Sequence, residues 1–117
     1  MKKYLVSMCL ATLAIMLYNC SGSKKATASA PTPYNYEANV KTVLESYCSP
    51  CHIPAKGGNK RAYDNFANTK ADIDEIIRRI EMNPGERGFM PFRKTTKLSD
   101  STIAIFKKWK ADGMMER

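Results

Sequence analysis

The sequence predicts one small all-α domain that follows an export segment. Three observations support this prediction: apolar residues recur at helical spacing in three places, no alternating strand pattern or internal repeat occurs, and the first 33 of the 117 residues differ in composition from the rest. The globular part, residues 34–117, contains 84 residues. A domain this small has a limited core and commonly needs a disulfide, a metal or a cofactor for stability.

Residues 1–19 have the order of a secretory signal peptide. Lys2 and Lys3 precede a mostly apolar run over residues 5–18, which is too short to span a membrane as a helix. A buried core helix is the alternative, but the run is apolar on all sides and lies at the extreme N-terminus. Export is therefore favoured, and Cys9 would be discarded with the signal.

The end of this segment resembles a bacterial lipoprotein signal, in which a cysteine is lipidated and becomes the new N-terminus. Cys20 would be that cysteine, and Leu17 fits the pattern, whereas Asn19 is larger than the small residue usual before it. The lipid anchor is favoured, and cleavage without lipidation remains the alternative. Residues 20–33 are small, polar and proline-bearing, which indicates a flexible tether. We therefore expect an exported, periplasmic protein held at a membrane through Cys20.

The exported part is basic. Loss of Lys2 and Lys3 from the 19 basic residues leaves 17 against 11 acidic ones, a net charge of +6. Such an excess fits nucleic acid, anionic lipid or an acidic protein partner. Export argues against nucleic acid, and the scattered basic residues are mostly read as a solvated surface.

Two amphipathic helices are predicted in the first part of the domain. Stripes at i, i+3, i+4 and i+7 are formed by Val40, Val43, Leu44 and Tyr47 and then by Ile73, Ile76, Ile77 and Ile80. Thr69 and Asp72 have capping-box spacing at the start of the second helix, and residues 83–85 (Asn-Pro-Gly) end it. A short helical turn is expected from Lys60 to Phe66, burying Tyr63 and Phe66.

A third helix closes the domain. Ser99 is a natural N-cap with Asp100 in the first turn, Leu98 and Ile103 have staple spacing across the cap, and Gly113 marks the end. Its apolar face consists of Ile105, Phe106 and Trp109. Residues 83–98 before it form a connection so long that something is expected to organise it.

The sequence Cys48-Ser49-Pro50-Cys51-His52 follows the first stripe. On a helical turn, positions i, i+3 and i+4 lie on one side, so both sulfurs and the imidazole would face one object. A structural zinc site needs four ligands, and outside the signal the only other cysteine is Cys20, with no second histidine. A redox dithiol of the thioredoxin type belongs to a βαβ pattern, which is absent. A structural disulfide would close a tight, strained loop.

The remaining interpretation uses every residue. Cys-x-x-Cys-His is the attachment motif of c-type haem, in which both thiols form thioethers to the porphyrin and the imidazole binds iron. With this motif, the segment Gly88 to Phe92 (GFMPF) and the closing helix with Trp109, residues 36–113 resemble a small class I cytochrome c.

That resemblance implies a cytochrome c-like fold, with three main helices and a short one around one covalent haem c. It also implies a second iron ligand on the loop before the last helix, for which Met90, followed by Pro91, is the match. Met82 is the competitor, but it ends a helix, where core packing is the usual role. His52 and Met90 together are the ligand set of an electron-transfer haem.

We therefore expect an electron carrier and not an enzyme, with redox proteins bearing acidic faces as partners. Pro54 could offer a carbonyl to the imidazole N–H, and Arg87 or Arg93 could pair with a haem propionate, although a solvated arginine is equally plausible. Two alternatives remain: a haem sensor or peroxidase-like module with an open sixth position, and a haem-free thiol- or metal-binding lipoprotein.

Overall fold

The computed structural model describes residues 32–117, so the expected signal peptide, Cys20 and most of the tether lie outside the described residues. Residues 31–117 form one compact unit. Within residues 32–117 the regular structure is helical, apart from one isolated bridge between Asn35 and Met115. The predicted all-α class is confirmed for this part of the chain. None of the helices in the described part is long and apolar enough to cross a membrane.

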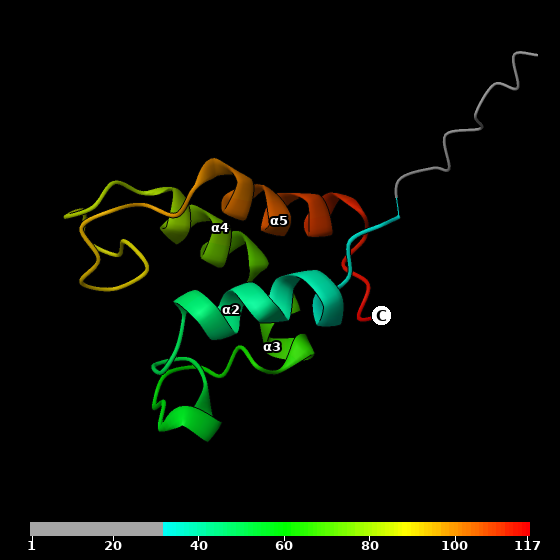
Figure 1. Ribbon diagram of the computed structural model, residues 1–117, viewed down its shortest axis with the longest axis horizontal. Coiled ribbons are helices and arrows are strands. Elements are labelled where there is room, and N and C mark those ends of the chain that lie inside the picture. The colour runs from blue at the N-terminus through cyan, green and yellow to red at the C-terminus, as the bar shows by residue number, and fades with distance from the viewer. Residues whose placement is uncertain (1–31) are drawn as a thin grey trace, which may run out of the picture. The chain divides into compact units, whose positions relative to one another are not determined.

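Two long connections separate the α-helices, one over residues 48–65 and one over residues 82–99 before the last helix (Figure 1). A π-helical turn, η1, runs directly into α2, and the remaining elements are a 3₁₀ turn, η2, and three α-helices. Their bounds are η1 Tyr36–Val40, α2 Lys41–Tyr47, η2 Pro54–Lys56, α3 Phe66–Ala71, α4 Ile73–Glu81 and α5 Asp100–Ala111. Helix α5 packs against both η1 and α4, and α3 packs against α4.

The first predicted stripe is confirmed over most of its length. Val40, Val43 and Leu44 are buried in the core, whereas Tyr47, the last member, is 45% exposed. The helix begins earlier than the stripe because the Asn35 side chain accepts a hydrogen bond from the Ala38 N–H, at 2.8 Å, and so caps η1.

The prediction for the middle of the chain was wrong in two respects. Residues 60–65 are not helical, and the short helix α3 begins only at Phe66, capped by the Asn65 side chain. Thr69 lies inside α3 instead of capping α4: it is fully buried, and its hydroxyl donates to the carbonyl oxygens of Tyr63 and Asn65. Asp72 occupies the N-cap position of α4 but forms no side-chain cap hydrogen bond. Local capping patterns misplaced the helix start because a buried threonine can bond backbone carbonyls instead.

The isoleucine stripe of α4 and both ends of α5 match their predictions. Ile73, Ile76 and Ile80 are buried, and Ile77 is half-buried against the same core. The Ser99 hydroxyl accepts from the Thr102 N–H at 3.2 Å, and Gly113 follows α5 with φ +94°, a left-handed conformation that favours glycine.

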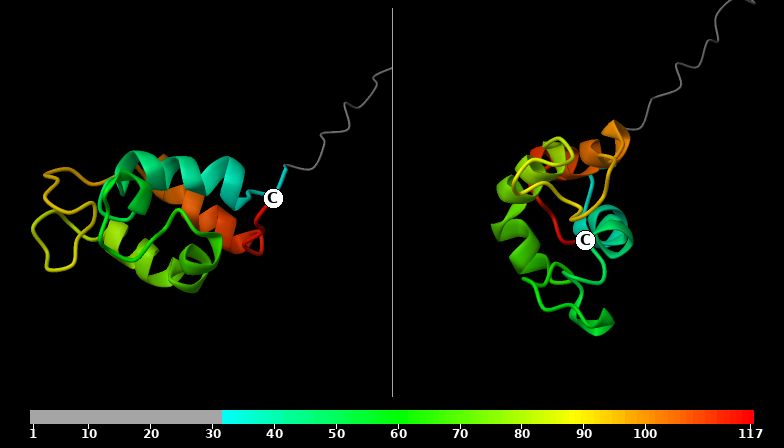
Figure 2. Two further views of the ribbon diagram at one scale, coloured as in Figure 1. Left: turned by 90° about the horizontal axis from the view of Figure 1, so that it is seen from below. Right: turned by 90° about the vertical axis from the view of Figure 1, so that its left-hand side faces the viewer.

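The core is centred on Trp109, which has no exposed surface. Its indole N–H donates to the Met115 carbonyl at 2.8 Å, and its ring lies beside those of Tyr36 and Phe66. The two ends of the described chain meet near this ring, because the Tyr36 N–H also donates to the Met115 carbonyl, at 2.9 Å. The loop 83–98 projects from the opposite end of the unit, as Figures 1 and 2 show.

Candidate functional site

Helix α2 ends at Tyr47, and residues 48–52 leave it as a turn that contains a cis peptide bond between Ser49 and Pro50. The Cys48 N–H donates to the Leu44 carbonyl at 2.8 Å, and the His52 N–H donates to the Cys48 carbonyl at 3.0 Å. The second bond has the i to i+4 spacing of a helical turn. The segment is therefore a turn closed by one i to i+4 backbone bond; that both thiols and the imidazole of His52 face one object stays a prediction.

The following loop folds back and fixes the backbone of this turn. The N–H groups of Lys60 and Tyr63 donate to the carbonyls of Cys51 and His52, at 3.0 and 2.9 Å. Gly58 passes so close that a Cβ atom there would lie 2.2 Å from the carbonyl oxygen of Pro50. Only glycine allows this approach without displacing the turn.

His52 is oriented by a backbone carbonyl. Its Nδ1 atom lies 2.7 Å from the carbonyl oxygen of Arg61. A carbonyl can only accept, so Nδ1 carries the proton and Nε2 of the neutral ring keeps its lone pair for a ligand. The sequence suggested Pro54 for this role, and that suggestion was wrong: Pro54 opens η2, and the carbonyl comes from Arg61, seven residues further on.

A tyrosine that the sequence assigned only to the core packs directly on this imidazole. The rings of His52 and Tyr63 are stacked, with centroids 4.6 Å apart and planes 11° apart. The Tyr63 hydroxyl donates to Asp72 at 3.2 Å, and Asp72 is also paired with the Arg61 guanidinium. Burial and the neighbouring Asp72 carboxylate raise the pKa of Tyr63 to about 12, so its hydroxyl remains a donor at neutral pH.

The two thiols differ in environment. Cys48 is half-buried against the core, Cys51 is exposed, and both are free. Burial, with a smaller effect of Cys51, raises the pKa of the Cys48 thiol to about 11. The raised pKa keeps the Cys48 thiol protonated at neutral pH, so Cys48 is not the activated thiolate that a redox dithiol uses. Within residues 32–117, no three His, Cys, Asp or Glu side chains lie close enough together to hold a metal ion.

The loop 83–98 is held by backbone hydrogen bonds and by buried apolar side chains. The Met90 N–H donates to the Arg79 carbonyl in α4 at 3.2 Å, and Phe89 beside it is buried. Met90 itself is half-buried and packs against the same core as Cys48. Met82 differs, because its sulfur accepts a hydrogen bond from Arg78 at 3.6 Å. That contact supports Met90 over Met82 as the methionine available to a ligand.

Met90 also lines a hollow of about 730 Å³ inside this loop. The hollow has four basic side chains and one acidic one on its walls, and the two arginines suggested for a propionate are both among them: Arg79, Arg87, Arg93, Lys94 and Glu86. Phe89 and Phe92 supply apolar surface. The size is in the range of ligand pockets, and the charge favours an anion. Cys48, Cys51 and His52 do not line this hollow.

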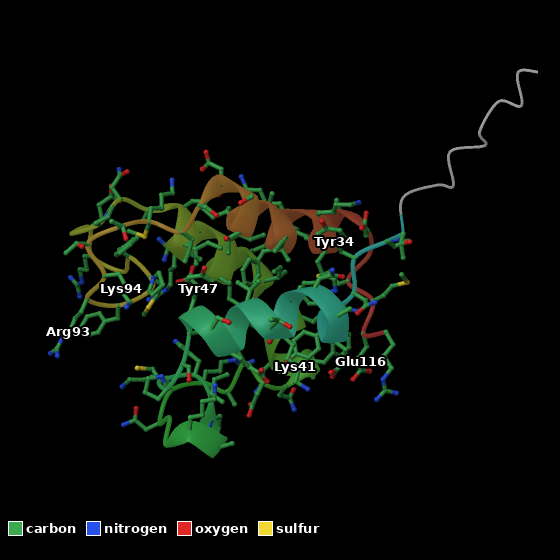
Figure 3. The ribbon with its side chains drawn as sticks, in the orientation of Figure 1. Tyr34, Lys41, Tyr47, Arg93, Lys94 and Glu116 are labelled. Carbon is green, nitrogen blue, oxygen red and sulfur yellow. The ribbon has the colours of Figure 1, made fainter. Side chains whose placement is uncertain are left out.

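The candidate residues thus form two groups. Cys48, Cys51 and His52 lie on one turn after α2, and Met90 lies with the arginines in the loop after α4. Figure 3 shows Tyr47, which precedes the turn, and Arg93 and Lys94 of the loop. Both groups border one apolar core through Cys48 and Met90. No family model, curated protein or solved structure matches this chain.

Proposed function

We propose that this chain is an exported monohaem c-type cytochrome that carries one electron between redox partners. Cys48 and Cys51 would hold the haem through thioethers, and His52 and Met90 would be the axial iron ligands. The all-α fold, with its helices packed on a core that Cys48 and Met90 border, is consistent with a cytochrome c-like architecture.

The observation that carries this proposal is the hydrogen bond at Nδ1 of His52, which sets the tautomer of the imidazole. Its Nδ1 proton is engaged by the Arg61 carbonyl, at 2.7 Å, directly after two free cysteines at the spacing of the attachment motif. Iron-binding histidines commonly donate their second ring N–H in this way, which fixes the tautomer and the ring. The imidazole is therefore prepared to bind through Nε2.

The chain's own residues would set the reduction potential of the bound haem and hold its propionates. A bound haem would supply an iron that changes between the ferrous and ferric states. Met90 would offer it a soft, weakly donating thioether, which would favour the ferrous state and raise the reduction potential. Arg87 and Arg93, on the wall that includes Met90, would pair with propionates.

The surroundings of the protein follow from the same proposal. The signal peptide and Cys20 would place it in the periplasm, anchored to a membrane by lipid. Its basic surface suits redox proteins with acidic docking faces, and the proposal assigns it no nucleic acid partner and no enzymatic reaction.

The mass of the purified protein tests the proposal directly, because a covalently attached haem adds to it. The full chain is expressed for export together with a haem attachment system, and the purified protein is measured by mass spectrometry and by a reduced-minus-oxidised spectrum. The mass of one haem and a reversible c-type spectrum are expected, and both should be lost when Cys48 and Cys51 are replaced by alanine. A wild-type mass equal to that of the bare polypeptide would exclude a cytochrome and favour a thiol- or metal-binding lipoprotein.

A further inference from the structure

The backbone of Tyr63 is held by three hydrogen bonds. Its carbonyl accepts hydrogen bonds from the Tyr36 hydroxyl at 2.8 Å and from the Thr69 hydroxyl at 3.0 Å. Both donors belong to residues that are almost completely buried. Its N–H donates to the His52 carbonyl at 2.9 Å. The backbone of Tyr63 therefore moves only if the core moves.

The side chain of Tyr63 is fixed as well. Its hydroxyl donates to Asp72, which lies where α3 ends and α4 begins, and whose carbonyl accepts the Ile76 N–H at 2.9 Å. Arg61 pairs with the same Asp72 oxygen through its guanidinium, while its backbone carbonyl binds His52. The contacts form a closed circuit from His52 through Arg61, Asp72 and Tyr63 back to His52.

We propose that Tyr63 is a positioning residue, which holds the plane of the His52 imidazole by stacking, and that the Arg61–Asp72 pair locks it there. The carbonyl bond at Nδ1 fixes the tautomer and the direction of the ring but tolerates a tilt of the ring plane. A parallel ring 4.6 Å away, at 11°, restricts this tilt and excludes water from one face. The inference rests on the proposed function, since the ring plane matters most when Nε2 binds iron.

The plane of an axial imidazole and its exposure to water affect the electronic state of the iron, so both can be measured. In the haem-loaded full chain, Tyr63→Leu is expected to broaden and shift the electron paramagnetic resonance signal of the ferric protein. It should also lower the reduction potential, because water at the imidazole stabilises the more highly charged ferric state. Tyr63→Phe keeps the ring but loses the bond to Asp72, so a smaller change in the same direction is expected.

Phe66→Leu is the matched control. Phe66 lies three residues away, packs against Tyr36 and Trp109, and has no ring contact with His52. It should lower stability as Tyr63→Leu does but leave the resonance signal and the potential unchanged. If Tyr63→Leu, like Phe66→Leu, gave the wild-type resonance signal and reduction potential, Tyr63 would be merely structural and the inference would fail. A wild-type chain without haem would instead overturn the proposed function itself.

Discussion

The backbone N–H of Met90 lies 3.2 Å from the carbonyl oxygen of Arg79 and ties the loop 83–98 to the last turn of α4. Arg79 in turn pairs with Glu75 one turn earlier, at 2.5 Å. The position of the proposed iron ligand therefore depends on the helix before it as well as on its own loop.

Replacing Met90 should change the haem, and replacing Met82 should not. We expect Met90→Ala to lower the reduction potential and to remove the methionine–iron absorption band, because the soft thioether that favours ferrous iron is lost. Met82→Ala is the control, since the Met82 sulfur already accepts from Arg78. An unchanged spectrum and potential in Met90→Ala would favour an open sixth position, as in a sensor or peroxidase-like module.

Gly58→Ala should reduce haem attachment. The added methyl group would lie 2.2 Å from the Pro50 carbonyl oxygen and 2.6 Å from that of Cys51, so the attachment turn must shift. Gly57→Ala is the control: its φ of +83° strains an alanine, but nothing lies within 4 Å of the new Cβ. The fraction of chain carrying haem mass should fall in the first variant and stay near wild type in the second. Equal fractions would show that the close approach is unimportant.

Trp109→Ala should be strongly destabilising. Loss of this fully buried ring creates a cavity among Tyr36 and Phe66 and costs about 3–5 kcal/mol. Trp109→Phe keeps a ring but leaves the Met115 carbonyl without its indole donor, for a smaller loss of about 1 kcal/mol. Denaturant unfolding of both variants measures the difference, and a cost below that of the phenylalanine variant would contradict the central place of Trp109.

Stability should fall in acid through Glu75. Hydrogen bonds from Arg78 and then Arg79 lower the pKa of its carboxyl from 4.5 to about 2. The folded state therefore binds this proton less tightly than the unfolded state does. The stabilisation is fully present above about pH 4.5 and is lost as the pH falls from there to 2. The unfolding free energies of wild type and Glu75→Gln should converge as the pH falls over this range. A difference between them that stays constant would contradict the lowered pKa of Glu75.

Charge reversal in the loop should slow association with an acidic redox protein. Phe92 is 65% exposed, Arg93 lies over its ring, and Lys94 follows. Arg93→Glu with Lys94→Glu is expected to lower the association rate about tenfold at low salt, with less effect at high salt. Lys56→Glu, outside the hollow, should change it little. An equal effect of all the reversals would indicate that net charge, and not this loop, guides docking.

Local patterns predicted the parts of the fold that local forces decide. Ser99 caps α5 and the isoleucine stripe faces the core, because capping and periodicity act within one or two turns. The turn from Cys48 to His52 was predicted for the same reason. Its haem and the roles of its residues remain predictions.

The partners of His52 could not be read from the sequence. Arg61 reaches it through a loop whose path depends on Gly58 passing close to Pro50, and Thr69 looked like a cap although its hydroxyl bonds the Tyr63 carbonyl. These contacts are set by how segments meet in space. One signal was available: a tyrosine 11 residues after the only histidine.

The pairing of residues 35–37 with residues 115–116 has a mechanical consequence. Asn35 and Met115 pair in parallel, with bonds of 2.9 and 3.1 Å from Tyr36 and Glu37 to the other end of the chain. In Figure 3, Tyr34 and Glu116 lie at one end of the unit and Arg93 at the other. A pull on both ends would load these parallel bonds in shear, so that they bear force together and break together. The turn with His52 and the loop with Met90 would carry no tension until these hydrogen bonds had broken.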